Sequence, residues 1–227
     1  MRKTKTRPII CNATDVRAIL DGRKTQTRRP IKSQPIGPEH MRYGGTDCDD
    51  DHIIIGDRSG NGLNIRNLAT GASSTLSLSR RTCPYGQPGD RLWVRETWCV
   101  EKVLDGRKPV DIEYGVPVFY TATKSWRDWD EQCVVGKRRP SAHMPRWASR
   151  ITLEITDVRV ERVQEISRED SLAEGPHPYG WGLNDGTCER NFAMVWDSIN
   201  AKRGYGWDSN PWVWVIEFKV IYPKALR

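Results

Sequence analysis

The sequence predicts a small, mixed α+β fold in which several bent strands form a barrel and short helices lie among them. The long alternating segment 151–163 changes its apolar phase after Asp157, which indicates a strand with a bulge or bend. The segment 212–221 is apolar on both faces at its start, as in a central strand. The helical patterns are short and end at glycines such as Gly22 and Gly204.

Length and composition favour one folded domain that carries insertions. The chain has 227 residues, of which 37% are hydrophobic and 29% charged, and this balance is typical of a globular protein. Gly, Ser, Asn and Asp are frequent from about 31 to 82, and a second irregular section runs from about 100 to 142. We therefore predict a single domain over residues 1–227 with insertions at about 31–82 and 100–142.

Charge and cysteine usage limit the partners and the compartment. The formal net charge of +7 favours polyanionic partners such as RNA, DNA or nucleotides. The six cysteines form no C-x-x-C pair, and no apolar stretch follows the basic N-terminus. We expect a cytoplasmic protein with free thiols, no signal peptide and no membrane span. No pattern indicates a cofactor, and the sequence leaves the oligomeric state open.

One acidic cluster deserves comparison with a metal site, because Cys48 and His52 flank a group of aspartates at positions 47 and 49–51. Their spacing matches no usual zinc or calcium pattern. We interpret the segment as an acidic loop and predict no metal.

The first elements lead to a basic stretch. Residues 8–11 have strand character, and Asn12 or Thr14 can cap the helix that follows. Gly22 suits the left-handed position that ends a helix. The next residues therefore form a loop or a strand up to Pro30.

The later elements follow in order. Short apolar pieces between 31 and 82 indicate hairpins or an elaborated loop, and a dense turn at 83–90 opens onto a strand at 91–98. Further strands are predicted at 116–120, 151–163 and 212–221. Ser167 and Asp170 form an S-x-x-D start for a short helix that ends at Glu174 and Gly175. A helix from about 188 to 201 carries one apolar stripe, made of Phe192, Val195, Trp196 and Ile199.

The basic stretch contains arginines that stay charged and a lysine whose charge depends on its surroundings. Arg23, Arg28 and Arg29 stay charged, whereas the pKa of Lys24 falls if neighbouring arginines and burial disfavour its ammonium form. A hydroxyl such as that of Thr27 beside a neutral lysine is one way to build an activated nucleophile. A regular strand would place Lys24 and Thr27 on opposite faces, so cooperation requires a turn or bulge between them. The alternative is a solvated basic loop.

The order of these motifs resembles a known family. Gly22, Lys24, Thr27 and Arg29 fit the G-x-K-x-x-T-x-R signature of the ASCH domain, a relative of the PUA RNA-binding fold. The resemblance covers residues 8–30, 83–98 and 143–221. The chain is similar above all to ASCH proteins encoded by phages and prophages. It implies a small β-barrel with short helices over its openings and a cleft near the signature.

The resemblance also implies an activity. Some small ASCH proteins are amidohydrolases that remove the acetyl group from the exocyclic amine of acetylated cytidine. By position, Thr27 corresponds to the nucleophile, Lys24 to its activator and Glu174 to the acid/base. Arg29 would orient the substrate or stabilise the oxyanion.

Two other functions remain open at this point. In a module that binds a nucleoside or single-stranded nucleic acid without chemistry, basic side chains hold phosphates and tryptophans stack on unpaired bases. The candidate substrate-binding residues are Arg23, Arg28, Arg29, Trp93, Arg95 and Trp147. In a phage accessory protein, the barrel would instead bind a host partner.

Overall fold

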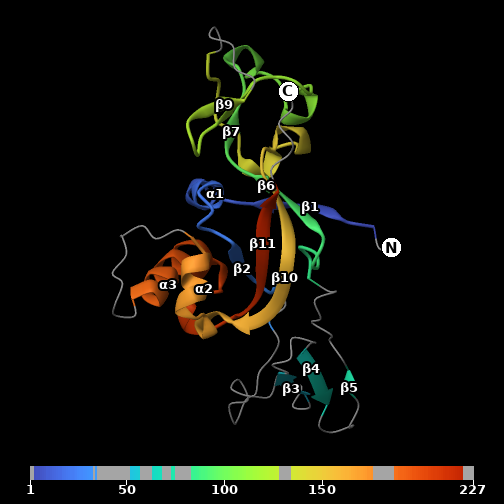
Figure 1. Cartoon of the computed structure of the whole chain (residues 1–227), viewed down its shortest axis with the longest axis vertical. Helices are drawn as coiled ribbons and strands as arrows, with labels where there is room; N and C mark the ends of the chain where they lie inside the picture. Colours follow the sequence, from blue (N-terminus) through green and yellow to red (C-terminus); the bar gives the residue numbers. More distant parts are fainter. Residues whose placement is uncertain are drawn as a thin grey trace.

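The computed structural model of the chain describes residues 3–32, 34, 52–56, 63–67, 73–74, 83–127, 134–175 and 187–221. It is a mixed α+β structure, as the sequence predicts, with one large sheet, two small sheets and three α-helices in the described residues (Figure 1). The predictions for the aspartates at 47 and 49–51, and for Cys48 beside them, lie outside the described residues.

The large sheet has five strands in the order β1-β6-β10-β11-β2. β1 and β6 are parallel, and the other neighbours are antiparallel. The bounds of the strands are Thr6–Ile10 for β1, Arg91–Arg95 for β6, Thr152–Arg162 for β10, Trp212–Ile221 for β11 and Gln26–Pro30 for β2. Backbone pairing stops at β1 and at β2, so the described residues form an open sheet, and the closed barrel predicted from the sequence is not found.

Helix α1 (Ala13–Leu20) begins and ends as its sequence indicates. The side chain of Asn12 accepts a hydrogen bond from the Asp15 N–H at 2.8 Å, which satisfies a free donor of the first turn. Gly22, after the helix, has a φ of +73°, a conformation that favours glycine. The chain then turns directly toward β2.

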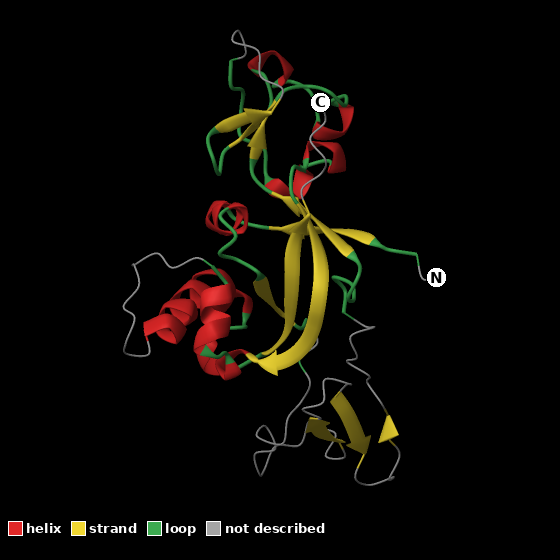
Figure 2. Cartoon of the chain, viewed as in Figure 1, coloured by secondary structure: helices red, strands yellow, loops and turns green. Residues whose placement is uncertain are grey.

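Strand β10 contains the predicted irregularity. Its pairing with β11 shifts between Ile155 and Asp157, where the apolar phase of the sequence changes. The shift exchanges which side chains face the core, so Ile155 and Val158 are both buried. Figure 2 shows the long, curved β10–β11 pair with the C-terminal helices on one side of it.

Helices α2 (Arg168–Ala173) and α3 (Thr187–Asn200) pack on that side. The hydroxyl of Ser167 accepts from the Asp170 N–H at 3.0 Å, which confirms the predicted helix start. Phe192 and Trp196 of α3 are buried against Val213 and Val215 of β11. The predicted place of Ile199 on the same stripe is wrong, because 44% of this residue is exposed.

The main core lies on the opposite face of the sheet. It includes side chains from four strands and α1, namely Ile9, Val16, Ile19, Leu92, Val94, Leu153, Ile155, Val158, Trp214, Ile216 and Phe218. Alternate residues of β11 therefore enter two different cores. This explains why the sequence of the strand is apolar on both faces.

The second predicted insertion contributes a lobe with its own small core. A sheet of β7 (Trp98–Cys99), β8 (Val118–Tyr120) and β9 (Ser125–Arg127) packs around Trp98, Tyr120 and Met144. Arg150 joins this lobe to the sheet through Glu96, with Nε–Oε1 at 2.8 Å and Nη2–Oε2 at 2.9 Å. Short 3-10 helices complete the described chain, at Lys102–Leu104, Pro109–Asp111, Ser141–His143, Arg146–Ala148, Val163–Glu165, Ala201–Arg203 and Trp207–Ser209.

Within the first predicted insertion the structure describes a third sheet. β3 (His52–Gly56), β4 (Leu63–Asn67) and β5 (Ser73–Ser74) pair antiparallel in chain order, which is the hairpin arrangement expected from the sequence. No helix in the described residues is long and apolar enough to cross a membrane. Four cysteines in the described part are free and buried, namely Cys11, Cys83, Cys99 and Cys188.

Candidate functional site

Lys24 occupies the irregular backbone between α1 and β2. Its backbone N–H donates to the carbonyl of Ala18 at 3.0 Å, so the end of α1 fixes its position. The neighbouring N–H of Thr25 donates to the carbonyl of Ala173 in α2 at 2.9 Å. The side chain of Lys24 is only 3% exposed. A lysine is rarely so buried unless its ammonium group is paired.

The ammonium group of Lys24 is paired with the end of α2. Nζ donates to the backbone carbonyl of Glu174 at 2.7 Å and to its carboxylate Oε2 at 2.9 Å. Asp15 of α1 places a second carboxylate 3.4 Å from the same nitrogen. The lysine therefore satisfies the carbonyl of Glu174 at the end of α2, where a cation is favourable, and joins segments 150 residues apart.

These carboxylates determine the charge of Lys24. Burial by itself lowers its pKa, but the negative charges of Glu174 and Asp15 outweigh burial, so the pKa lies above its ordinary value. The prediction of a neutral lysine is therefore wrong. The arginines expected to lower its pKa instead bond to backbone carbonyls: Arg23 Nη1 donates to that of Gly175 at 2.8 Å, and Arg29 Nη2 donates to that of Ile10 at 2.7 Å.

The close contact of α2 with Lys24 depends on Gly175. This residue has a φ of +84°, and a Cβ added there would lie 2.6 Å from the Cβ of Lys24 and 2.9 Å from that of Ala18. Both the conformation and the space require glycine. The pair Glu174–Gly175 thus supplies the carboxylate and permits the approach of the lysine backbone.

Thr27 lies in β2, after the irregular residues, so no regular strand separates it from Lys24. It pairs with Ile216 of β11 and alternates with Arg28, whose side chain contacts α2. Thr27 is 5% exposed. Its hydroxyl forms no hydrogen bond with any residue that the structure describes.

Cys11 is a buried thiol directly after β1, in the same part of the molecule as Lys24 and Arg29. Burial raises the pKa of this thiol to about 11, and the charges of Arg29, Asp15 and Lys24 also act on it. Arg29 shares a face of β2 with Thr27 because the two are two residues apart. Thr27 therefore lies on the face of β2 opposite Arg28, and no hydrogen bond in the described residues joins it to Lys24 or Glu174.

Arg28 belongs to a network of carboxylates and does not point to solvent. Nη2 lies 3.0 Å from Glu161 Oε2 and 2.8 Å from Asp170 Oδ2, and Nη1 lies 3.3 Å from Glu174 Oε1. Its side chain is completely buried. The prediction that Arg28 holds a phosphate is wrong, since three carboxylates already use its donors.

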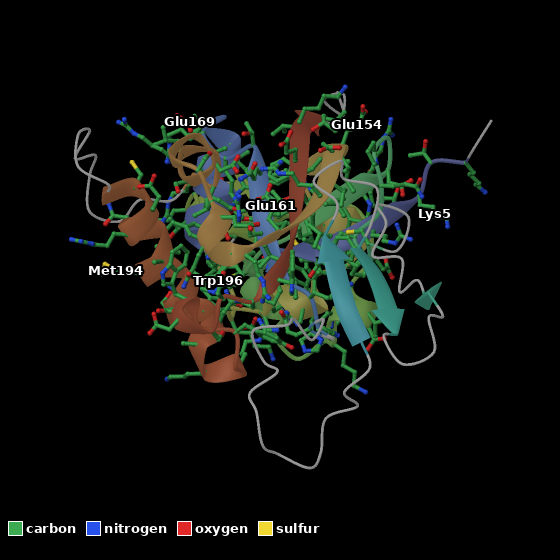
Figure 3. The ribbon with its side chains drawn as sticks, turned by 90° about the horizontal axis from the view of Figure 1, so that it is seen from below. Lys5, Glu154, Glu161, Glu169, Met194 and Trp196 are labelled. Carbon is green, nitrogen blue, oxygen red and sulfur yellow. The ribbon has the colours of Figure 1, made fainter. Side chains whose placement is uncertain are left out.

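Arg159 of β10 extends the same network. It pairs with Glu161, with Glu217 of β11 and, at 2.9 Å, with Asp170. Burial by itself raises the pKa of Asp170, but hydrogen bonds and charge from Arg28 and Arg159 outweigh burial and hold the pKa below its ordinary value. Figure 3 labels Glu161 within this network, between the sheet and the C-terminal helices.

The ion pairs that the structure describes at this site join more carboxylates than cations. Its cations are Lys24, Arg28 and Arg159, and its carboxylates are Asp15, Glu161, Asp170, Glu174 and Glu217. The basic stretch that appears cationic in the sequence is therefore embedded in an acidic environment. This composition disfavours a phosphate group at the site and suits an uncharged ligand.

The predicted aromatic residues lie apart from this cluster. Trp93 is 7% exposed and packs under the guanidinium groups of Arg95 and Arg146, at 4.6 and 5.6 Å from its ring centroid. Trp147 packs in the second lobe. In the described residues, no hydrogen bond or ring contact joins either tryptophan to Lys24, Thr27 or Glu174. The prediction that Trp93 stacks on a base is not supported, because Arg95 and Arg146 cover its ring, and the prediction for Trp147 stays a prediction.

Sequence reasoning missed the supporting carboxylates. The S-x-x-D motif identified Asp170 only as part of a helix start, and Glu161 appeared only as an alternating polar position of a strand. The useful signal was that β10 carries Arg159 and Glu161 on the face that packs toward α2 and α3. Charges at such positions require partners.

The described part of the chain contains no group of three or more His, Cys, Asp or Glu side chains arranged to hold a metal ion. Comparisons with known proteins gave no match: no protein-family description, no curated protein and no solved structure resembles this chain at a significant level.

Proposed function

We propose that this protein is an ASCH-type amidohydrolase that removes an acyl group from the exocyclic amine of a cytidine-type nucleoside. One observation carries the proposal. The signature residue Lys24 and the acid/base candidate Glu174, 150 residues apart, meet at 2.9 Å in a buried site beside the strand of Thr27. A buried lysine paired with a carboxylate, with its pKa shifted by that pairing, is a candidate catalytic group, and Thr27 three residues later supplies a hydroxyl.

Two features of the sheet support the ASCH-type fold. The signature spans the end of α1, the irregular residues and β2, so Gly22 ends the helix and the reactive residues follow at once. Although the sheet is open, the side chain of Arg29 in β2 reaches the carbonyl of Ile10 in β1 at 2.7 Å. The two outer strands are therefore close at this end, which is the relation expected in a barrel with one unpaired seam.

The charge of the site selects among nucleotide-type substrates. In the ion pairs of the described residues Lys24 meets two carboxylates, and Arg28 is already used by three. A nucleoside carries no phosphate and enters this environment without electrostatic repulsion. The phosphate of a nucleotide would be repelled by the carboxylates. We therefore assign the free nucleoside as the substrate class.

The raised pKa of Lys24 changes its role in the reaction. Its ammonium group stabilises the negative charge that develops on the acyl oxygen, and Glu174 acts as the base. The oxygen of Thr27 bonds to the acyl carbon, its proton passes to Glu174 and then to the departing amine, and the amide C–N bond breaks. Water then attacks the threonine ester, Glu174 again transfers the proton, and the carboxylic acid and the free hydroxyl are released.

The proposal is tested by chromatography of N4-acetylcytidine incubated with the purified protein and its variants. We expect Thr27→Val and Glu174→Gln to lower kcat by about 100-fold or more. Thr25→Val is the matched control, because Thr25 is exposed in the same segment. Thr27→Val at wild-type activity, or a wild-type protein that deacylates no N-acylated nucleoside, would reject the proposal.

The pH profile separates the two roles of Lys24. If the ammonium form is active, activity falls only as the pH rises above the ordinary lysine value of 10.5, because the pKa of Lys24 is raised. If the neutral amine activates Thr27, activity instead rises toward alkaline pH. Lys24→Met should be inactive in either case, and its thermal unfolding shows whether the fold survives.

A further inference from the structure

We propose that the outer face of β1 and β6 binds the sugar–phosphate backbone of single-stranded nucleic acid through Arg95 and Arg146. This is a site separate from the lysine cluster, and it does not depend on the proposed deacylation. It rests on the place of these two side chains around Trp93, and on the exposure of the strand beside them.

Strand β6 divides its side chains between two environments. Leu92 and Val94 enter the main core, and the alternate residues Arg91, Trp93 and Arg95 point to the other face. The parallel neighbour β1 presents Thr6, Pro8 and Ile10 to solvent on that same face. Figure 3 shows Lys5 and Glu154, which border this region, on the side of the molecule opposite Met194 of α3.

Trp93 positions two guanidinium groups. The Arg95 and Arg146 guanidinium carbons lie 4.6 and 5.6 Å from its ring centroid. The indole is 7% exposed and so cannot serve as a platform for a base. Its function in this arrangement is to hold the two cations over its surface, which limits their freedom before any ligand binds.

Neither guanidinium group has an acidic partner in the described residues. Arg95 donates from Nη1 to the carbonyl of Ala142 at 3.0 Å, and its buried Nε has no partner. Arg146 is exposed and forms no ion pair there, while burial of part of its side chain lowers its pKa. The nearest carboxylate in register, Glu154 opposite Arg91, pairs with Lys219 at 2.9 Å. Two fixed, unneutralised guanidinium groups are a natural receptor for phosphate oxygens.

The neighbouring strand favours a single strand over a duplex. Pro8 pairs in register with Trp93, and Ile10, 47% exposed, pairs with Arg95. Exposed aliphatic side chains beside phosphate-binding cations suit an unpaired base or a ribose, whereas a duplex offers mainly phosphates at its surface. The planes of the guanidinium groups can also stack on an unpaired base.

The test is fluorescence anisotropy of a labelled, single-stranded RNA oligonucleotide at several salt concentrations. We expect the Arg95→Gln/Arg146→Gln double variant to raise Kd about tenfold or more, since it removes two charged contacts. The slope of log affinity against log salt should become shallower by about 1.4, which corresponds to two phosphates of a single strand. The matched control is Arg107→Gln/Lys108→Gln, which removes the same charge from exposed positions of the second lobe.

Three results would overturn the proposal. These are equal affinities of the two double variants, a wild-type affinity that does not depend on salt, and displacement of the RNA by polyglutamate or inorganic phosphate as effectively as by unlabelled RNA. A Trp93→Leu variant keeps both arginines but loses the aromatic ring. It should bind more weakly than Trp93→Phe, and thermal unfolding of both variants confirms that they fold.

Discussion

Gly175 is the position at which one added methyl group tests the contact between α2 and Lys24. A Cβ there would lie 2.6 Å from the Cβ of Lys24 and 3.0 Å from its Cα, with the backbone at a φ of +84°. The left-handed conformation costs a residue with a Cβ about 1–2 kcal/mol. Extra volume in a packed site costs about 1–3 kcal/mol more. We therefore expect Gly175→Ala to lower the free energy of unfolding by about 2–5 kcal/mol.

Gly204 supplies the matched control. Its φ of +82° is nearly the same, but no atom lies within 4 Å of the position of an added Cβ. Gly204→Ala should therefore cost only the backbone contribution, about 1–2 kcal/mol. The difference between the two variants isolates the steric contacts of the added methyl group with Lys24 and Ala18.

Both variants can be measured by urea unfolding, followed through tryptophan fluorescence, and by thermal unfolding. In a protein of this size each kcal/mol shifts Tm by about 2–4 °C, so Gly175→Ala should melt roughly 4–20 °C below wild type. If Gly175→Ala and Gly204→Ala were equally stable, the close contact would carry no energy and the reasoning would be refuted. We also expect Gly175→Ala to lose deacylation activity, because it moves Lys24 away from Glu174.

Two further predictions concern buried charge. Glu96→Gln leaves the half-buried guanidinium of Arg150 without its bidentate partner and should lower the free energy of unfolding in urea by about 3–5 kcal/mol. The Glu96→Leu/Arg150→Met double variant should recover most of this stability. A double variant as unstable as the single one would contradict the account. Because Arg28 and Arg159 lower the pKa of Asp170, its contribution to stability is complete above the unfolded value of 3.8 and is lost as the pH falls through the lower folded value. Asp170→Asn should therefore be less stable at neutral pH and lose less of its Tm on acidification, and an unchanged pH dependence would count against this assignment.

Much of the local structure could be predicted because it depends on neighbours in the chain. Asn12 and Ser167 cap helices by bonding to N–H groups three residues ahead, and Gly22 ends a helix through its own backbone freedom. The bulge in β10 follows from a change in apolar phase that is visible in the residues around Asp157.

The candidate site was predictable only in part. Lys24 and Glu174 were identified from the sequence, and the structure brings them together at 2.9 Å. The charge of Lys24 and the orientation of Arg28 were predicted incorrectly. Neighbours along the chain are basic, whereas neighbours in space are acidic.

The sequence by itself determined where helices begin and end, which strands alternate, and which residue types are available for chemistry. Only the tertiary structure decided that Lys24 stays charged, that Arg28 is buried among carboxylates, and that Trp93 lies under two arginines. The physical reason is that a pKa and an ion pair depend on distances of a few ångströms. Glu161, Asp170 and Glu174, which lie 133 to 146 residues from Arg28 along the chain, reach such distances only when the sheet and α2 have assembled.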